Sequence, residues 1–269
     1  MAVLILQDSP TMLDGQRHSH MMRKFFTWKW VKRILLIGIG LSLLASVYVR
    51  WIFDPLLGPI YDRLSRQKAV HTSEQLDQTL EALPTLSYKR LVRTDLARGD
   101  GLSSMKHYQD QEFIRISGVN RYRYLVGNQR VHQFLPGMRI WRFRLPRLGH
   151  TQYLLIDKRV LRQLLSFRQA LEKQGLNPNA FAVSSGFRPP SYNKRVGGKP
   201  KSRHLHGQAI DILIQDLNSD GRSNQTDVDL AYKILHEQIV TDKGGLGRYN
   251  SNKRLLHLDC RGYRARWHY

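Results

Sequence analysis

Two imidazoles and one carboxylate share the stretch Ser202-Arg-His204-Leu-His206-Gly207-Gln-Ala209-Ile-Asp211, and a further pair follows downstream in His257-Leu-Asp259. Catalytic zinc takes three protein ligands, for which imidazole nitrogen and carboxylate oxygen are both suitable, and keeps a fourth position open for water. The small residues at 207 and 209 let the chain turn closely from a loop into a strand, which we expect over 210–214. On that strand Asp211 would face the same point as His204. A single histidine is nevertheless more often structural than metal-binding, and this chain contains 11.

Further motifs lie on both sides of this stretch. Upstream stands Ser184-Ser-Gly186-Phe-Arg188-Pro-Pro-Ser-Tyr-Asn193, and downstream stand Gly244-Gly-Leu-Gly247-Arg-Tyr249, His257, Asp259, Arg264 and Trp267. Together, over about residues 155–269, the series resembles the zinc D-alanyl-D-alanine carboxypeptidases and murein endopeptidases. These peptidases share a superfamily with lysostaphin and hedgehog, and within it the chain is most similar to the YcbK-like murein endopeptidases.

The resemblance implies a fold and a set of site residues. It implies an α+β domain at 155–269, with a small antiparallel sheet and flanking helices around a zinc site. It implies that His204, Asp211 and His257 bind Zn²⁺. Arg188 would orient or polarise the substrate, a task that suits a planar guanidinium with parallel donors. Ser202 is expected to bind the peptide or to support a ligand, and a loop-capping hydroxyl is the alternative.

The general base is where the sequence departs from several relatives. They place a histidine two residues, or an acid three residues, before the last ligand, and here those positions are Leu255 and Arg254. Asp259 is our candidate for the catalytic base because it is close in sequence to His257. Residues 257 and 259 of a strand point the same way, so Asp259 could equally orient a ligand from behind. Two further candidates stay open: His206 and His268.

A second ion site is predicted in the insertion 216–227, whose pattern fits a calcium loop of the EF-hand type. Oxygen-bearing side chains occupy positions 1, 3, 5, 9 and 12, glycine occupies position 6, and a backbone carbonyl serves at position 7. The Ca²⁺ ligands would be Asp216, Asn218, Asp220, Arg222, Asn224 and Asp227. A serine at position 8, and Asp instead of Glu at position 12, depart from the usual loop. The alternative is a polar turn with Asp227 as the N-cap of a helix over 227–240.

The sequence of the N-terminal part is typical of a segment that targets a chain to a membrane. Residues 34–49 carry no charge and are mostly large and apolar, with an arginine on each side, and six basic residues lie between positions 17 and 33. This pattern predicts a single-pass signal-anchor at 34–53 in a bacterial inner membrane, with a cytoplasmic basic segment at 1–33 and a periplasmic remainder. A cleaved signal peptide is the alternative, although no A-x-A cleavage motif follows the apolar run.

The exported part divides into three segments. Residues 54–110 are predicted to be a linker with a short helix over 72–83, capped by Thr72 and Gln75. Residues 111–154 are predicted to be β-rich, with strands over 122–126, 138–145 and 153–156 whose arginines make either a solvated face or a glycan-binding face. In 155–269, Asp157 opens a helix that stops at Gly175, and further strands are expected at 180–183 and 210–214.

Composition narrows the class of partner. Lys and Arg total 43 against 21 acidic residues, a net charge of +22 that favours a polyanionic partner. No motif for reading bases or phosphates is present, so we expect no nucleic acid, and peptidoglycan or an anionic membrane surface remains. The one cysteine, Cys260, excludes an internal disulfide and is interpreted as a small packing residue.

These observations lead to one principal hypothesis. The chain would be a zinc metallopeptidase that hydrolyses peptide bonds in peptidoglycan stem peptides or crosslinks, as a D,D-carboxypeptidase or a murein endopeptidase, through zinc-activated water. The alternative is a non-catalytic module that keeps zinc for structure and binds or assembles the cell wall. Its support is the lack of a base at positions 254 and 255.

Overall fold

The chain is described by a computed structural model that covers residues 63, 68–94, 101–102, 108–135, 138–140, 143–145, 151–250 and 253–268. All of these residues lie in one compact unit, Tyr61–Tyr269. The anchor predicted at 34–53 and the basic segment at 1–33 lie outside the described residues. Within the described part, no helix combines the length and the apolar character that crossing a bilayer requires.

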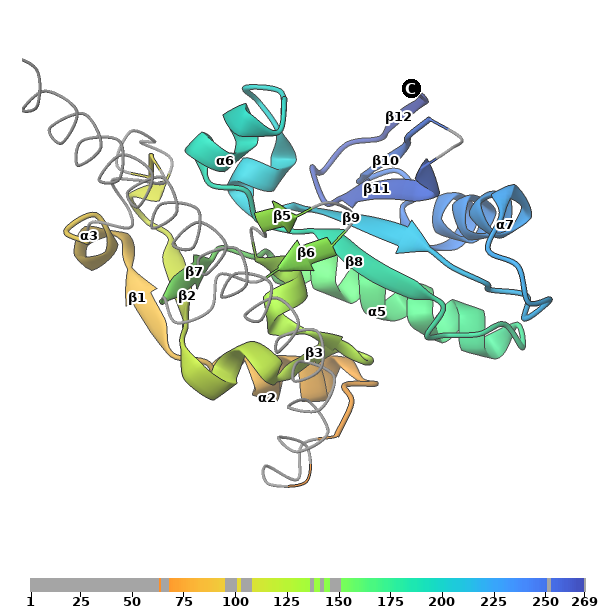
Figure 1. Cartoon of the computed structure of the whole chain (residues 1–269), viewed down its shortest axis with the longest axis horizontal. Coiled ribbons are helices and arrows are strands. Elements are labelled where there is room, and N and C mark those ends of the chain that lie inside the picture. Colours follow the sequence, from red (N-terminus) through yellow and green to blue (C-terminus); the bar gives the residue numbers. More distant parts are fainter. Residues whose placement is uncertain are drawn as a thin grey trace, which may run out of the picture. The chain divides into compact units, whose positions relative to one another are not determined.

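A five-stranded sheet forms the centre of this unit (Figure 1). Its strands, in spatial order, are β12 (Ala265–His268), β10 (Gly245–Arg248), β11 (Leu255–Asp259), β9 (Ala209–Ile214) and β8 (Phe181–Ser185). Neighbouring strands run antiparallel except β10 and β12, which run parallel. The predicted α+β class is confirmed. The sheet is mixed and not purely antiparallel, because the last strand joins the edge of β10 in the same direction.

The two longest described helices are α5 (Lys158–Lys173) and α7 (Gln225–Ile234), which continues as the π-helical turn η6 (Leu235–Ile239). Asp157 caps α5, as its sequence predicts, by accepting a hydrogen bond from the Arg159 N–H at 2.9 Å. The helix predicted from residue 227 begins earlier, because Asn224 is its N-cap and Asp227 completes the capping box. Apolar side chains of α5 and α7 belong to the same core as the sheet.

The two faces of the sheet carry different side chains, because residues alternate along each strand. On β9 and β11, the isoleucines and leucines of one parity are fully buried in the core: Ile210, Ile212, Ile214, Leu256 and Leu258. The opposite parity places Asp211 and His257 directly across from one another in the strand register. Asp259 follows on the same face. The polar side chains of this region are therefore gathered on the face away from that core.

The segment before residue 155 supplies shorter elements. They are α2 (Ser73–Glu81), β1 (Thr85–Ser87), α3 (Tyr88–Leu91), β2 (Glu112–Ile116), η3 (Gly118–Tyr122), β3 (Tyr124–Val126), β4 (Gln129–Arg130), η4 (Val131–Phe134), β5 (Met138–Ile140), β6 (Phe143–Leu145) and β7 (Gln152–Leu154). The capping box of Thr72 and Gln75 is present at α2, as predicted. The strand predicted over 138–145 is instead a hairpin, because β5 folds back onto β6 with Ile140 opposite Phe143. The strand predicted over 122–126 begins only at Tyr124, since Tyr122 ends a 3₁₀ turn.

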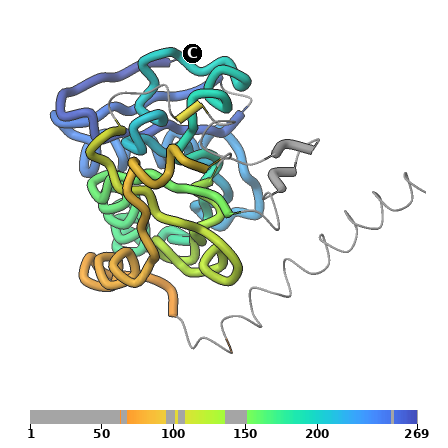
Figure 2. The backbone as a smooth tube through the Cα atoms, turned by 90° about the vertical axis from the view of Figure 1, so that its left-hand side faces the viewer, coloured from red at the N-terminus to blue at the C-terminus, as the bar shows by residue number. Residues whose placement is uncertain are grey.

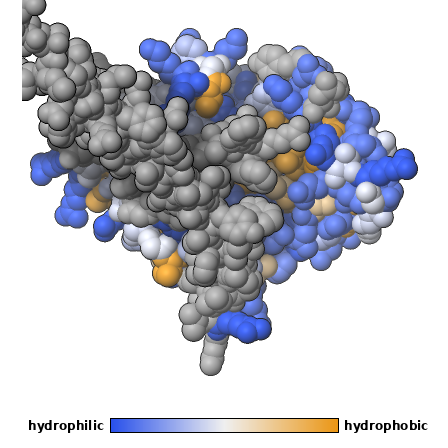
Figure 3. Space-filling model, in the orientation of Figure 1, coloured by the Kyte–Doolittle hydropathy of each residue, from blue (hydrophilic) through white to orange (hydrophobic). Residues whose placement is uncertain are grey.

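This earlier segment packs against the five-stranded sheet. Figure 2 shows the described residues between 70 and 135, in orange to yellow-green, lying beside the later part of the chain. The amide of Gln129 covers the edge of β8, donating to the Phe181 carbonyl at 3.0 Å and accepting from the Val183 N–H at 3.1 Å. One hydrophobic core spans both parts. On the face drawn in Figure 3, the described surface is accordingly mostly hydrophilic.

Candidate metal centre

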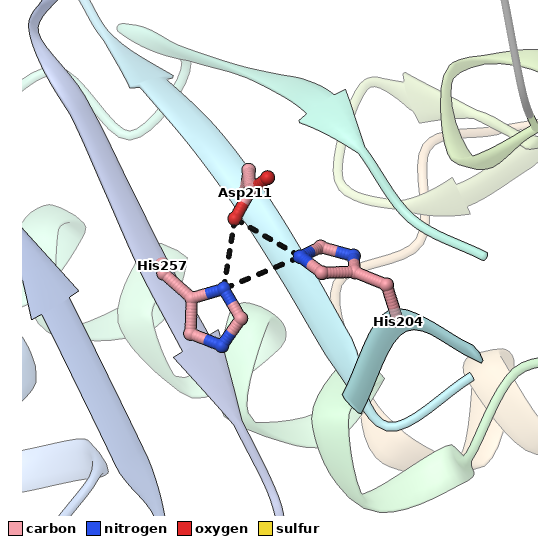
Figure 4. Close-up of side chains that lie close together, drawn as sticks. All are labelled: His204, Asp211 and His257. Carbon is pink, nitrogen blue, oxygen red and sulfur yellow. Dashed lines mark hydrogen bonds and ion pairs between the residues drawn. The ribbon is translucent and has the colours of Figure 1, made fainter. Parts of the chain in front are cut away.

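Three buried side chains converge on one point on the polar face of the sheet (Figure 4). His204 Nε2 lies 3.2 Å from Asp211 Oδ1 and 3.3 Å from His257 Nδ1. His257 Nδ1 lies 2.9 Å from Asp211 Oδ1. The exposed fraction is 1% for His204, 4% for Asp211 and 6% for His257. The structure therefore brings together the two histidines and the aspartate that the sequence singles out.

Each of the three residues is placed by a specific local structure. Asp211 and His257 face each other across β9 and β11. His204 lies on the short 3₁₀ helix η5 (Arg203–His206), which ends at Gly207 with a left-handed φ of 65°. A Cβ at this glycine would lie 2.4 Å from the Leu155 carbonyl oxygen. Glycine is required there for both reasons, and the turn that follows leads directly into β9.

Hydrogen bonds on the outer side of each imidazole fix which nitrogen faces the centre. His204 Nδ1 lies 2.7 Å from the Gly186 carbonyl, which only accepts, so this nitrogen carries the proton. His257 Nε2 lies 3.0 Å from Asp259 Oδ2, a carboxylate, so this nitrogen donates as well. In neutral imidazoles, both inward nitrogens then present lone pairs to each other and to Asp211 Oδ1. Facing acceptors repel, and a cation with affinity for nitrogen and oxygen resolves the conflict. The donor set therefore fits zinc.

The electrostatics favour the metal-binding forms of His204 and Asp211, but not that of His257. Burial lowers the pKa of His204 against the opposing effect of Asp211, which keeps the imidazole neutral. Burial alone would raise the pKa of Asp211, but His204, His257 and Arg188 hold it well below its usual range. Burial alone would lower the pKa of His257, but the carboxylates of Asp211 and Asp259, which accept hydrogen bonds from the charged imidazole, prevail and raise it. A proton thus competes with a cation for His257.

Asp259 lies behind His257 and not beside the metal-facing atoms. It is fully buried and accepts hydrogen bonds from the Gly245 N–H at 3.1 Å and from Arg261 Nη2 at 2.6 Å. Burial would raise the pKa of Asp259, but His257 and Arg261 hold it well below its usual range. A carboxylate held in this way fixes the orientation and tautomer of His257. The geometry does not fit the general base suggested by its sequence position, and it favours the orienting role.

The predicted substrate residues line a cleft of about 710 Å³ over the metal centre. Arg188 Nη2 forms an ion pair with Asp211 Oδ2, and its Nε donates to Ser185 Oγ at 2.8 Å, so the guanidinium is held on two sides. Its backbone N–H also donates to the His204 carbonyl at 3.1 Å. Ser202 lines the same cleft and makes no side-chain cap to η5, so the capping alternative is not observed.

The structure adds a residue that the sequence reasoning did not assign. Tyr249 lines the cleft, and its hydroxyl donates to Asp211 Oδ1 at 3.2 Å. Burial raises the pKa of this phenol, so it stays protonated and acts as a donor. Its only sequence signal is its place at the end of the glycine-rich segment 244–249. Of the open candidates, His206 lines a separate cavity of about 330 Å³, and His268 packs beside Tyr232; neither lines the metal cleft.

In the predicted calcium loop, side-chain oxygens accept hydrogen bonds from nearby backbone. Asp216 accepts from the N–H groups of Asp220 and Gly221, and Asp220 accepts from Arg222. Asp227 is buried, and its two oxygens accept from Leu217 and Asn224. The carboxylates of the loop form no cluster of the kind seen at His204, Asp211 and His257. These contacts are those of the polar-turn alternative, and calcium stays a prediction.

The arrangement was compared with known proteins. Residues 154–258 match the family model described as Peptidase M15. No curated protein gives a match to the chain. The matched segment contains all three converging side chains together with Arg188 and Tyr249. Residues 154–258 are thus a Peptidase M15 domain whose buried His-Asp-His group is a candidate metal site, consistent with a metallopeptidase.

Proposed function

We propose that this chain is a zinc metallopeptidase that hydrolyses peptide bonds in the stem peptides or crosslinks of bacterial peptidoglycan, as a D,D-carboxypeptidase or a murein endopeptidase of the YcbK-like kind. The observation that carries the proposal is the convergence of His204, Asp211 and His257 at the base of a cleft within an M15 domain. The basic cleft suits the acidic wall polymer. An anchor at 34–53 would hold the domain on the periplasmic side of the inner membrane, where that polymer lies.

Each residue around the metal centre would have a separate role in the proposed hydrolysis. Bound zinc would supply an activated water and polarise the scissile carbonyl. Arg188 is fixed by Asp211 and Ser185, so its guanidinium is oriented before the substrate arrives and donates to a substrate oxygen. Tyr249, on the same cleft, has a single hydroxyl proton, which would turn from Asp211 Oδ1 to donate to the developing oxyanion. Ser202 would bind the peptide backbone at the cleft wall.

One observation favours the alternative, a wall-binding module that keeps zinc without catalysis. Among the described residues that line the cleft, there is no carboxylate and no histidine other than His204 and His257. A peptidase needs a group that takes the proton of the attacking water. The alternative keeps the same metal site and the same polymer as ligand, and differs only in the absence of turnover.

Digestion of purified, crosslinked peptidoglycan separates the two functions. The zinc-loaded protein is expected to release D-alanine or uncrosslinked muropeptides, detected by mass spectrometry, and His204→Ala is expected to abolish both release and zinc retention. The matched control is His71→Ala, since His71 is an exposed histidine outside the cleft. Retained zinc with no product from the wild-type protein would reject the peptidase and leave the binding module.

A further inference from the structure

The cleft over the metal centre is lined by six cationic side chains and, among the described residues, by no acidic one. They are Arg188, Lys199, Lys201, Arg203, Lys253 and Arg261. Arg188 and Arg261 form ion pairs with buried carboxylates, Asp211 and Asp259. The other four make no ion pair with any described acidic residue. The mouth of the cleft thus carries positive charge that the described part of the protein does not neutralise.

Several cations elsewhere on the described surface have an acidic partner, although others, such as Lys89, Lys173 and Lys233, form no ion pair with a described acidic residue. Arg159 pairs with Asp157, Arg162 with Asp77, and Arg248 with Asp229. An ordinary solvated surface mixes both signs in this way. The concentration of one sign in a concave site focuses the potential and raises the local concentration of anions. We therefore attribute the gathering of six cations in one concave site, and not the lack of ion pairs by itself, to a ligand.

Contacts with other residues hold part of the charged wall of the cleft in place. Lys199, Lys201 and Arg203 follow the short helix α6 (Pro190–Arg195) and precede His204. The buried Asn193 holds the loop by donating from Nδ2 to the Lys199 carbonyl at 3.0 Å. Arg203 is fixed by contacts of 3.4 Å with Gln208 Oε1 and with the Tyr263 hydroxyl. Lys253 lies on the turn between β10 and β11, after Asn250 of the same cleft. Cations therefore enter from two separate segments.

We infer that this cleft selects stem peptides that carry free carboxylates beside the scissile bond, over the same peptides with those carboxylates converted to carboxamides. The inference rests on the proposed function and specifies its substrate. A carboxylate and the corresponding carboxamide have nearly the same size. Shape therefore distinguishes them poorly, whereas unpaired lysines distinguish them by charge. Hydrogen bonds from a cation to a carboxylate are about twice as strong as those between neutral groups.

The test uses two synthetic crosslinked stem peptides. They differ only beside the scissile bond, where one carries a free carboxylate and the other the corresponding carboxamide. With zinc-loaded full-length protein, kcat/KM for the carboxylate peptide is expected to exceed that for the carboxamide peptide by about tenfold or more, the effect of one charge-assisted hydrogen bond. The ratio is expected to fall as salt is raised, because exposed charges are screened. The triple variant Lys199→Gln, Lys201→Gln, Lys253→Gln is expected to bring the ratio close to one.

A matched variant removes the same charge elsewhere. Lys89→Gln, Lys173→Gln, Lys233→Gln changes three exposed lysines outside the cleft and is expected to leave the ratio at its wild-type value. Equal kcat/KM for the two peptides, or an equal drop of the ratio in both triple variants, would overturn the inference. Dissociation constants for both peptides are measured in parallel. If neither peptide is cleaved, the proposed hydrolysis fails, and the ratio of the two dissociation constants alone decides whether the cleft selects carboxylates.

Discussion

Replacing Asp259 by asparagine removes one negative charge behind His257 and leaves the volume almost unchanged. The carboxylate accepts from His257 Nε2, from the Gly245 N–H and from Arg261. The asparagine side chain has one acceptor oxygen, whereas these donors use both oxygens of the aspartate. The NH₂ group that replaces the second oxygen then faces a hydrogen-bond donor. The tautomer of His257 that presents Nδ1 to the centre then loses its support. Changes at such supporting residues cost about 10–100-fold in metal affinity, roughly 1.4–2.8 kcal/mol of binding free energy.

Zinc affinity is measured by competition with a chromophoric chelator, and hydrolysis is measured on the same preparations. The matched control is Asp229→Asn, because Asp229 is an exposed carboxylate that pairs with Arg248 of the same sheet, away from the cleft. It is expected to bind zinc like the wild-type protein. Unchanged zinc affinity in Asp259→Asn together with a loss of hydrolysis would refute the orienting role. That outcome would instead support the role of Asp259 as the general base.

Three further predictions concern the frame of the site and its ions. Gly207→Ala is expected to lower the free energy of unfolding, measured in urea, by about 2–4 kcal/mol. The left-handed backbone costs an alanine about 1–2 kcal/mol, and the clash of the added Cβ with the Leu155 carbonyl adds to that cost. Its control, Gly175→Ala, has a φ of 70° and no atom near the added Cβ, so it should cost only the backbone part. Chelation of zinc is expected to lower the melting temperature of the wild-type protein and not of His204→Ala; at zinc about a thousand times above its Kd, the ion contributes about 4 kcal/mol. Calcium in the loop 216–227 would raise the melting temperature of the zinc-loaded protein, and the absence of any shift would contradict that prediction.

Parts of the structure that depend on local chemistry could be predicted from the sequence. The caps at Thr72 and Asp157 satisfy backbone donors within one turn, so a short pattern is sufficient to find them. The convergence of His204, Asp211 and His257 could be predicted because strand periodicity and a family resemblance agreed. The hairpin at β5 and β6 could not, because an alternating pattern does not show where a strand folds back.

The roles of individual site residues were harder to predict because they depend on what lies opposite in space. Alternation placed Asp259 on the same face as His257 but could not say on which side of the imidazole the metal lies. That choice follows from His204 and Asp211, which lie beside His257 Nδ1 and come from other segments of the chain, so that Asp259 is left with Nε2. Tyr249 likewise reaches Asp211 only through the pairing of β10 with β11 and of β11 with β9.

The segment 108–135 lies outside the match to Peptidase M15, yet it supports the metal site directly. The Tyr108 hydroxyl donates to the Leu205 carbonyl at 2.6 Å, next to His204. Phe187, next to Arg188, packs against Tyr108 and Phe113 with ring centroids 6.3 Å and 5.9 Å apart. Its N–H donates to the Phe134 carbonyl at 3.1 Å.

A fragment of residues 151–269 should therefore fail to fold, although it contains every predicted zinc ligand. Without the earlier segment, Phe187 loses burial that contributes about 1.5–3 kcal/mol. The β8 edge also loses the amide of Gln129 and becomes a row of unpaired groups. Circular dichroism and zinc binding of this fragment, compared with residues 61–269, test the dependence. Equal zinc affinity of the two would show that the M15 segment is self-sufficient and that residues 108–135 serve another purpose.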